Sequence, residues 1–213
     1  MEADQALNEI SVEIISCYKC ILSKSRKNAV PGDGPADAEV MFIGEGPGFH
    51  ENEQGLPFVG QAGKFLDELL ESAGLNRNKV FITNVVKCRP PGNRDPQEAE
   101  LKACETYLDQ QIAIIDPLVI VTLGRFSMAK YFKNARISRI HGQAAWVQGR
   151  YIIPMYHPAA ALHQRSLRPV IEKDFAKLPK MLEKARKMKS KINTEYPNEE
   201  GNAVDDATQL SFF

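Results

Sequence analysis

Short apolar runs that alternate with helical patterns constrain the fold of this chain more than any other feature. Runs at 39–44, 80–84 and 118–124 are rich in β-branched residues, as strands of a buried sheet are. Amphipathic patterns at 61–74 and 95–115 lie between them and predict helices, and Asp95 with Pro96 fits the N-cap and first turn of the second one. Two further apolar runs, "AAWVQ" and "YIIPMYH", also read as strands. This alternation predicts an α/β fold with a mainly parallel sheet.

Length and composition favour one domain followed by a tail. Residues 1–189 carry the α/β pattern, whereas 190–213 are polar and acidic and predict a disordered segment. The net charge is +0, so the whole chain is not a polycation, although a local basic face remains compatible with a nucleic-acid partner. The start of the chain lacks the pattern of a signal peptide, and no apolar run reaches about 18 residues. We therefore expect a cytoplasmic protein.

The chain has 4 cysteines in an uneven arrangement. Cys17 and Cys20 form a C-x-x-C pair, whereas Cys88 lies in a loop pattern and Cys104 in a helical pattern. Structural disulfides are rare in a reducing compartment, which favours free thiols or metal ligands. Zinc usually takes two C-x-x-C pairs, and an iron–sulfur cluster tolerates less regular spacing because it needs only four converging thiolates. The spacing favours iron–sulfur and leaves zinc as the alternative.

Three polar or glycine-rich segments follow predicted strands. They are Gly44–Gly60, Asn84–Arg94 and His157–Gln164. The carboxyl ends of parallel strands meet at one edge of a sheet, and ligands bind there. The first segment, "GEGPG", matches neither the dinucleotide-binding fingerprint nor a P-loop. It predicts a rigid loop whose backbone amides closely approach a ligand.

The motifs "GEGPGFHENEQGLPFVGQAG", "TNVVKCRPPGNRDP" and "HPAAAL" occur in this order, and the chain resembles the uracil-DNA glycosylase superfamily. The cysteine pattern resembles family 4 of that superfamily, whose members carry a [4Fe–4S] cluster. The resemblance covers about residues 5–185. We therefore expect a three-layer α/β/α fold with a central four-stranded sheet. The implied activity is monofunctional hydrolysis of the N-glycosidic bond of uracil in DNA, the first step of base excision repair.

The resemblance implies roles for five residues around the extruded base. His157 would hydrogen-bond the uracil O2 as negative charge develops there. Asn84 would read the Watson–Crick edge, donating to O4 and accepting from N3–H. Phe58 would stack on the base. Glu45 and Gly46 would place backbone amides near it.

Two departures from other families of the superfamily affect the expected site. Gly46 stands where those families have an aspartate that orients the attacking water, as in family 4 generally. We expect Glu51 to position the water or to set the polarity of the pocket, held by Asn93. Gly48 replaces an aromatic residue that excludes the methyl group of thymine elsewhere, so discrimination against thymine needs another source.

The DNA itself would meet apolar and basic residues around the pocket. Leu162 is the predicted wedge that fills the gap left by the flipped nucleotide, with His163 or Ala161 as alternatives. Expected phosphate contacts come from basic side chains near the pocket, namely Lys87, Arg89, Arg94 and Arg139. The segment after Asn84 lacks the insert of a covalently trapping relative, so we expect turnover without a histidine–DNA adduct.

The last residues of the chain predict a protein partner, and two other functions compete with the glycosylase. Gln209–Phe213, "QLSFF", resembles the peptide by which bacterial replication proteins bind the sliding clamp. The protein is expected to be a monomer.

One competing function is an iron–sulfur nucleic-acid-binding protein without glycosylase activity. The other is a zinc-stabilised small-molecule hydrolase, although the sequence shows no acidic or histidine ligand for an open zinc site.

Overall fold

The computed structural model of the protein describes residues 1–195 and contains one sheet, with strand order β2-β1-β3-β5-β4. Its strands are β1 (Val40–Gly44), β2 (Phe81–Asn84), β3 (Val119–Leu123), β4 (Ala145–Val147) and β5 (Arg150–Met155). The pairs β2–β1, β1–β3 and β3–β5 are parallel, which confirms the expected mainly parallel sheet. The sheet has a fifth strand beyond the four expected, because β4 pairs antiparallel with β5. Gln148 (φ 50°) and Gly149 (φ 78°) form the tight turn between them.

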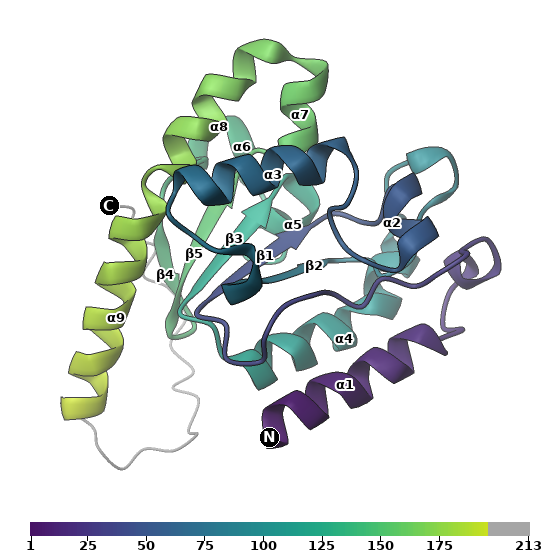
Figure 1. Cartoon of the computed structure of the whole chain (residues 1–213), viewed down its shortest axis with the longest axis horizontal. Helices are drawn as coiled ribbons and strands as arrows, with labels where there is room; N and C mark the ends of the chain where they lie inside the picture. Colours follow the sequence, from purple (N-terminus) through teal and green to yellow (C-terminus); the bar gives the residue numbers. More distant parts are fainter. Residues whose placement is uncertain (196–213) are drawn as a thin grey trace.

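Four helices cover one face of the sheet, the upper face in Figure 1. These helices are α3 (Gln61–Ser72), α7 (Pro158–His163), α8 (Arg168–Phe175) and α9 (Leu178–Glu195). The core on this side packs Phe42 of β1 and Val121 of β3 against Leu66, Leu69 and Phe175 from the helices. Phe42 stacks on Phe175 with ring centroids 5.9 Å apart, which joins α8 to the centre of the sheet.

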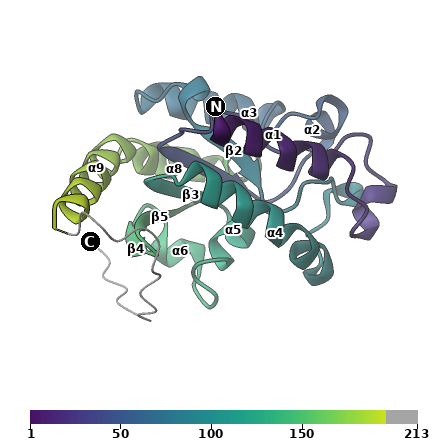
Figure 2. The same ribbon diagram turned by 90° about the horizontal axis from the view of Figure 1, so that it is seen from below.

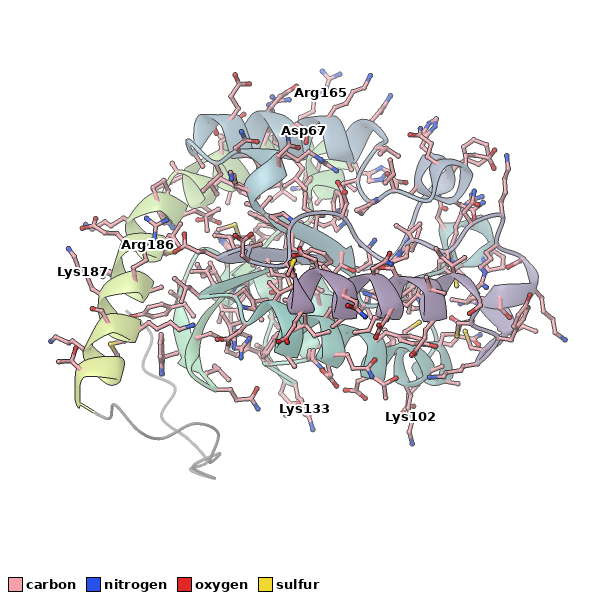
Figure 3. All side chains as sticks on the ribbon, turned by 60° about the horizontal axis from the view of Figure 1, so that its bottom comes forward. Asp67, Lys102, Lys133, Arg165, Arg186 and Lys187 are labelled. Atoms are coloured by element: carbon pink, nitrogen blue, oxygen red, sulfur yellow. The ribbon has the colours of Figure 1, made fainter. Side chains whose placement is uncertain are left out.

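The other face is covered by a second helical layer, whose helices α1 and α4 lie toward the viewer in Figure 2. It consists of α1 (Glu2–Ile15), α4 (Glu98–Ile115), α5 (Arg125–Ala129) and α6 (Ile137–Ile140). Met41, Ile43 and Ile120 of the sheet pack there against Leu108 and Met128. The three-layer α/β/α architecture is therefore confirmed. In Figure 3 the labelled side chains Lys102, Lys133 and Arg165 point outward from the two layers.

Short helices complete the connections between these layers. They are α2 (Phe49–Gln54) and the 3-10 helices η1 (Ile21–Lys24), η2 (Arg77–Lys79), η3 (Pro91–Asn93) and η4 (Arg165–Leu167).

Helix α4 begins three residues later than the sequence pattern suggests. Its N-cap is Gln97, and the Glu100 carboxylate accepts a 2.8 Å hydrogen bond from the Gln97 backbone N–H. Arg94 donates to both oxygens of Glu100, at 2.9 and 2.6 Å. Asp95 therefore does not cap the helix, and it forms an ion pair with Arg125 of α5 instead.

Helix α9 continues beyond the predicted start of the tail. The prediction placed the boundary at residue 190, but the helix runs to Glu195. Arg186 anchors it to Glu39, with 2.9 Å between Nε and Oε1, and Lys189 pairs with Asp116 at 2.9 Å. The predicted clamp peptide, Gln209–Phe213, lies outside the described residues. No helix within residues 1–195 is long and apolar enough to cross a membrane.

Helix α3 begins against the loop that follows β1. A Cβ on Gly63 would lie 1.8 Å from the carbonyl oxygen of Phe58, so only glycine permits this approach. Phe58 itself adopts φ 53°, a conformation that non-glycine residues rarely occupy. The start of α3 therefore fixes the backbone of Phe58.

We predict that Gly63→Ala destabilises the fold and displaces Phe58. The added methyl group meets backbone rather than a flexible side chain, so we expect a loss of about 1–3 kcal/mol in the free energy of unfolding. Denaturant unfolding measures this loss. Gly74→Ala is the control at the other end of α3, because a Cβ there meets nothing within 4 Å and costs only the strain of φ +66°. Equal stability losses with an undisturbed Phe58 would contradict the prediction.

Candidate active site

A cavity of about 520 Å³ lies at the carboxyl edge of the parallel strands. Its lining comes from the loops after β1 and β2, from α3 and from α7: Glu45, Gly46, Pro47, Gly48, Glu51, Phe58, Ala62, Asn84, Pro90, Asn93, Arg94, Asp95, His157, Ala159, Ala160 and His163. The prediction that the three segments after strands meet at one edge is therefore confirmed. Figure 1 shows α7 and α2 on the two sides of this edge.

Asn84 is the last residue of β2 and projects into the cavity. It pairs with Gly44 in the parallel register of β1 and β2. Its side chain is buried, and within the described residues its Oδ1 has no hydrogen-bond partner. A buried acceptor without a partner costs about 1–3 kcal/mol, so such an atom at a cavity wall indicates a ligand that donates to it.

His157 follows β5 and is held as a neutral imidazole. Its Nδ1 accepts a 3.1 Å hydrogen bond from the backbone N–H of Ala159, at the start of α7. Burial lowers the pKa of His157 from 6.5 to about 4, and the charge of Glu51 opposes that shift. Because Nδ1 accepts, the neutral ring carries its proton on Nε2 and can donate from there.

Phe58 and His157 form one wall of the cavity. Their ring centroids are 5.4 Å apart, with an interplanar angle of 23°. A Cβ on Gly44 would lie 2.3 Å from Oδ1 of Asn84 and 2.8 Å from Cζ of Phe58. The missing side chain at Gly44 therefore leaves the space in which the amide and the ring come together.

The Glu51 carboxylate organises the loop between β1 and α3. Its Oε1 accepts from the backbone N–H groups of Val59 and Gly60, both at 2.9 Å, and its Oε2 accepts from Gly48 at 3.1 Å. The expectation that Asn93 holds Glu51 is wrong, because the Asn93 Oδ1 accepts from Nε of Arg89 at 2.8 Å. Three backbone amides hold this carboxylate at the cavity wall.

Glu45 and Gly46 line the cavity directly after β1. The Glu45 carbonyl accepts from the Val86 N–H at 3.1 Å, which fixes the backbone at this point. Burial raises the pKa of the Glu45 carboxyl, Asp95 adds to the shift, and Arg125 opposes it. A Cβ on Gly46 would lie 2.7 Å from Val86, so this position packs closely against the neighbouring loop.

The prediction that Lys87 contacts DNA phosphate is wrong. Its side chain is buried, and Nζ donates to Oγ1 of Thr83 at 2.6 Å and to Oε1 of Gln111 at 2.7 Å. Burial lowers the pKa of Lys87 to about 7. Gln111 in turn donates to the carbonyl of Pro31 at 2.9 Å. The sequence showed a lysine beside the motif but not the direction of its side chain.

The other residues predicted to contact DNA lie in different settings. Arg94 is bound by Glu100, whereas Arg139 is exposed on α6 and does not line the cavity. His163 is exposed and lines the cavity. Leu162, beside it on α7, has 45% of its surface exposed, unlike the buried alternative wedge Ala161. Of these two apolar candidates, only Leu162 can reach outward.

The four cysteines line a second, smaller pocket with residues from α1 and α4. All are free thiols, with Cys17 and Cys20 half-buried and Cys88 and Cys104 buried. Burial raises the pKa of both buried thiols, that of Cys104 to about 11. Within residues 1–195, no group of three or more His, Cys, Asp or Glu side chains is arranged to hold a single metal ion.

Arg26 links this pocket to the N-terminal helix. It donates from Nη1 to Sγ of Cys88 at 3.2 Å and from Nη2 to the carbonyl of Ile15 at 2.7 Å. The backbone N–H of Lys19 lies 3.4 Å from Sγ of Cys17. A donor set of four thiols with N–H groups directed at sulfur suits thiolates bound to an iron–sulfur cluster.

Several lining residues were missed in the sequence. Pro47, Ala62, Ala159 and Ala160 carry no reactive group, so their types gave no indication of a site. Asp95 was assigned to a helix cap, although it lies at the cavity. Its Asp-Pro pair fitted a helix start equally well, and only the tertiary pairing with Arg125 separates the two interpretations.

Comparisons with known proteins agree with this geometry. The family model for the uracil DNA glycosylase superfamily matches residues 31–186. The chain is 50% identical to the type-4 uracil-DNA glycosylase of Sulfurisphaera tokodaii, over 81% of this chain and 83% of that protein. It is 47% identical to the type-4 enzyme of Archaeoglobus fulgidus, over 82% and 92%, and 40% identical to that of Thermotoga maritima, over 85% and 97%. The chain therefore belongs to the uracil-DNA glycosylase superfamily.

Proposed function

We propose that this protein is a monofunctional uracil-DNA glycosylase that extrudes uracil from DNA, hydrolyses its N-glycosidic bond and so initiates base excision repair. The type-4 relatives support this activity over most of the chain. The observation that carries it is the unpartnered Oδ1 of Asn84 at the cavity wall, within the described residues. An extruded uracil supplies the missing donor through its N3–H.

Asn84 selects the base by the order of its donor and acceptor. Its Oδ1 accepts from N3–H of uracil while its Nδ2 donates to O4. Cytosine presents an acceptor at N3 and an amino donor at position 4, the reverse order, so both hydrogen bonds are lost: two acceptors face each other at N3 and two donors at position 4. The register with Gly44 supports this role, because the Asn84 amide and the Phe58 ring fit together only where a side chain is missing.

His157 stabilises the leaving group. As the bond to deoxyribose breaks, negative charge develops on the uracil, and a donor already aimed at O2 lowers the barrier. The Nε2–H of the neutral imidazole supplies this donor, since Nδ1 is occupied by the Ala159 N–H. Phe58, stacked beside His157, stacks on the base and keeps water from its face.

Glu51 acts on the sugar side of the reaction. Its Oε2 accepts one amide hydrogen bond, so it retains capacity to accept from a water or a sugar group. Its negative charge also favours the oxocarbenium character that the deoxyribose acquires. Asn93, Glu45 and Gly46 line the same cavity and contribute polar contacts to the nucleotide.

The DNA lies across the mouth of the cavity in this proposal. Leu162 fills the gap left by the flipped nucleotide, because it is exposed on the helix that lines one side of the pocket. His163 and Arg94 line the cavity and would lie beside the strand, whereas the contact of Arg139 with DNA stays a prediction. The clamp peptide at Gln209–Phe213 and the monomeric state remain predictions.

We propose that Cys17, Cys20, Cys88 and Cys104 hold a [4Fe–4S] cluster. The four thiols fit it because they line one pocket without disulfides, and a buried set of thiolates needs bound cations to offset its charge. When bound, the cluster would supply a cross-link between α1 and the segment from Cys88 to α4, and no electron that the hydrolysis uses. Zinc is the alternative, but its usual sites take two C-x-x-C pairs, and this chain has only the pair Cys17 and Cys20.

The decisive experiment is release of uracil from a single-stranded oligonucleotide, read as alkali-labile cleavage. Asn84→Ala should lower kcat/KM by about 10²-fold or more, because it removes contacts that recognise the base and orient the leaving group. It also removes a buried acceptor without a partner, so the melting temperature should change little.

Asn78→Ala replaces an exposed asparagine and serves as the matched control. An inactive wild-type protein, with its cysteine site loaded, would contradict the proposed activity and favour a nucleic-acid-binding protein. A fully active Asn84→Ala would contradict only the role of Asn84.

The state of His157 predicts a specific pH dependence. Because its pKa in the folded protein is about 4, below the unfolded value of 6.5, the unfolded state takes up the proton first. Its contribution to stability is complete above pH 6.5 and is lost as the pH falls toward 4. Nitrogen NMR should show a neutral ring protonated on Nε2 at pH 6.

His157→Gln keeps an N–H donor that does not titrate. The free energy of unfolding of this variant should fall less steeply than that of the wild type between pH 6.5 and 4. Titration of His157 near pH 6.5, or identical slopes for the two proteins, would contradict the assignment.

Loss of one cysteine should remove the bound iron and loosen the attachment of α1, with a smaller effect on hydrolysis of the glycosidic bond. Purified wild type should contain about four iron and four sulfide per chain. We expect Cys17→Ser to lose most of both and to melt at a lower temperature, with weaker DNA binding. Ser16→Ala, next to it on an exposed position, is the control. Stoichiometric zinc without iron would contradict the cluster.

A further inference from the structure

Phe49 is a large aromatic side chain that the fold leaves exposed beside the cavity. It begins α2, directly after Gly48 of the cavity lining, and 54% of its surface is accessible. The cores of the two helical layers do not include it. His50 meets it edge-on, with ring centroids 5.5 Å apart. The ring therefore stands at the rim of the pocket without being buried in the fold.

Arg89 holds this ring in place from the neighbouring loop. Its guanidinium carbon lies 5.3 Å from the centroid of the Phe49 ring. Its Nε donates to Oδ1 of Asn93, a residue of the cavity lining. The loops after β1 and β2 are thus joined next to the cavity by a ring, a guanidinium and an amide. A cation over an aromatic face contributes about 0.5–1 kcal/mol at such exposed sites.

Exposed apolar groups consequently border the cavity on two sides. Leu162 lies on the α7 side, with 45% of its surface exposed, and Phe49 lies on the α2 side. Figure 1 shows these two helices apart, with the sheet edge between them. Leu162 has a proposed role as the wedge. Phe49 has none, although an aromatic ring next to a guanidinium matches the stacking sites that hold unpaired bases.

We propose that Phe49 and Arg89 form a stacking subsite for a base next to the flipped uracil in single-stranded DNA. The base stacks on the exposed part of the Phe49 ring, and Arg89 contacts the adjoining phosphate while it keeps the ring oriented. The inference rests on the proposed function, because the uracil in the pocket sets the position of its neighbours. A single strand is the favoured occupant, since its bases are free to turn outward, whereas those of a duplex remain paired.

The test compares two probes in direct binding. Both are labelled single-stranded oligonucleotides with one 2′-fluoro-deoxyuridine, whose electron-withdrawing fluorine slows bond cleavage. In the second probe, abasic sites replace both neighbouring nucleotides. Phe49→Ala should weaken binding of the first probe about 5- to 100-fold and leave binding of the second nearly unchanged. Phe49→Trp should keep the affinity of the wild type for both.

Val12→Ala is the control, since Val12 is 57% exposed on α1 in the other helical layer. An equal loss on both probes would show that Phe49 does not stack on a neighbouring base, and it would overturn the subsite. Unchanged affinity for both probes would also overturn it, and would assign the exposed ring to another partner, such as a protein.

Uracil release by the wild type from an unmodified oligonucleotide tests the proposed function independently of the subsite. If the wild type releases uracil while Phe49→Ala binds both probes like the wild type, only the subsite is wrong. If the wild type releases no uracil, the proposed function is wrong and the subsite with it.

Discussion

The parallel register of β1 and β2 is the constraint on which the rest of the site depends. It places Gly44 opposite Asn84 at the point where both strands end. A side chain at Gly44 would overlap both the Asn84 amide and the Phe58 ring, so the absent Cβ is what lets these two groups meet at the cavity wall. The loop after β1 brings Phe58 back against Gly44, and the three backbone amides that donate to Glu51 fix the path of this loop.

The cavity concentrates features that a fold optimised only for stability would avoid. Asn84 has a buried acceptor without a partner in the described chain, Phe58 has a positive φ, and His157 is kept neutral by burial. Each of these features costs free energy, and the rigid neighbours around the site maintain them. In the proposed function, an extruded uracil would give the Asn84 acceptor its missing donor and would receive a hydrogen bond from Nε2 of His157.

The sequence predicted the strands, their mainly parallel pairing and the meeting of three loops, because these follow from periodicity and from the geometry of parallel sheets. It failed where side-chain direction decides the outcome. Lys87 is charged and lies beside the motif, yet it turns inward to Thr83 and Gln111. Asp95 looked like a helix cap and pairs with Arg125 instead. Charge and spacing do not encode which way a loop residue points, so these contacts could not be predicted.

The cysteine pocket and the cavity are coupled by the short segment that begins at Cys88. Arg26 binds the sulfur of Cys88 and the end of α1, while Arg89, the next residue, reaches Asn93 at the cavity and Phe49 at its rim. The backbone at Cys88 therefore connects directly to Arg89, whose side chain reaches the cavity residue Asn93. The C-x-x-C pair lies in the irregular segment between α1 and η1, so in the proposed cluster it would act on the placement of the Cys88 segment and not on the bond that breaks.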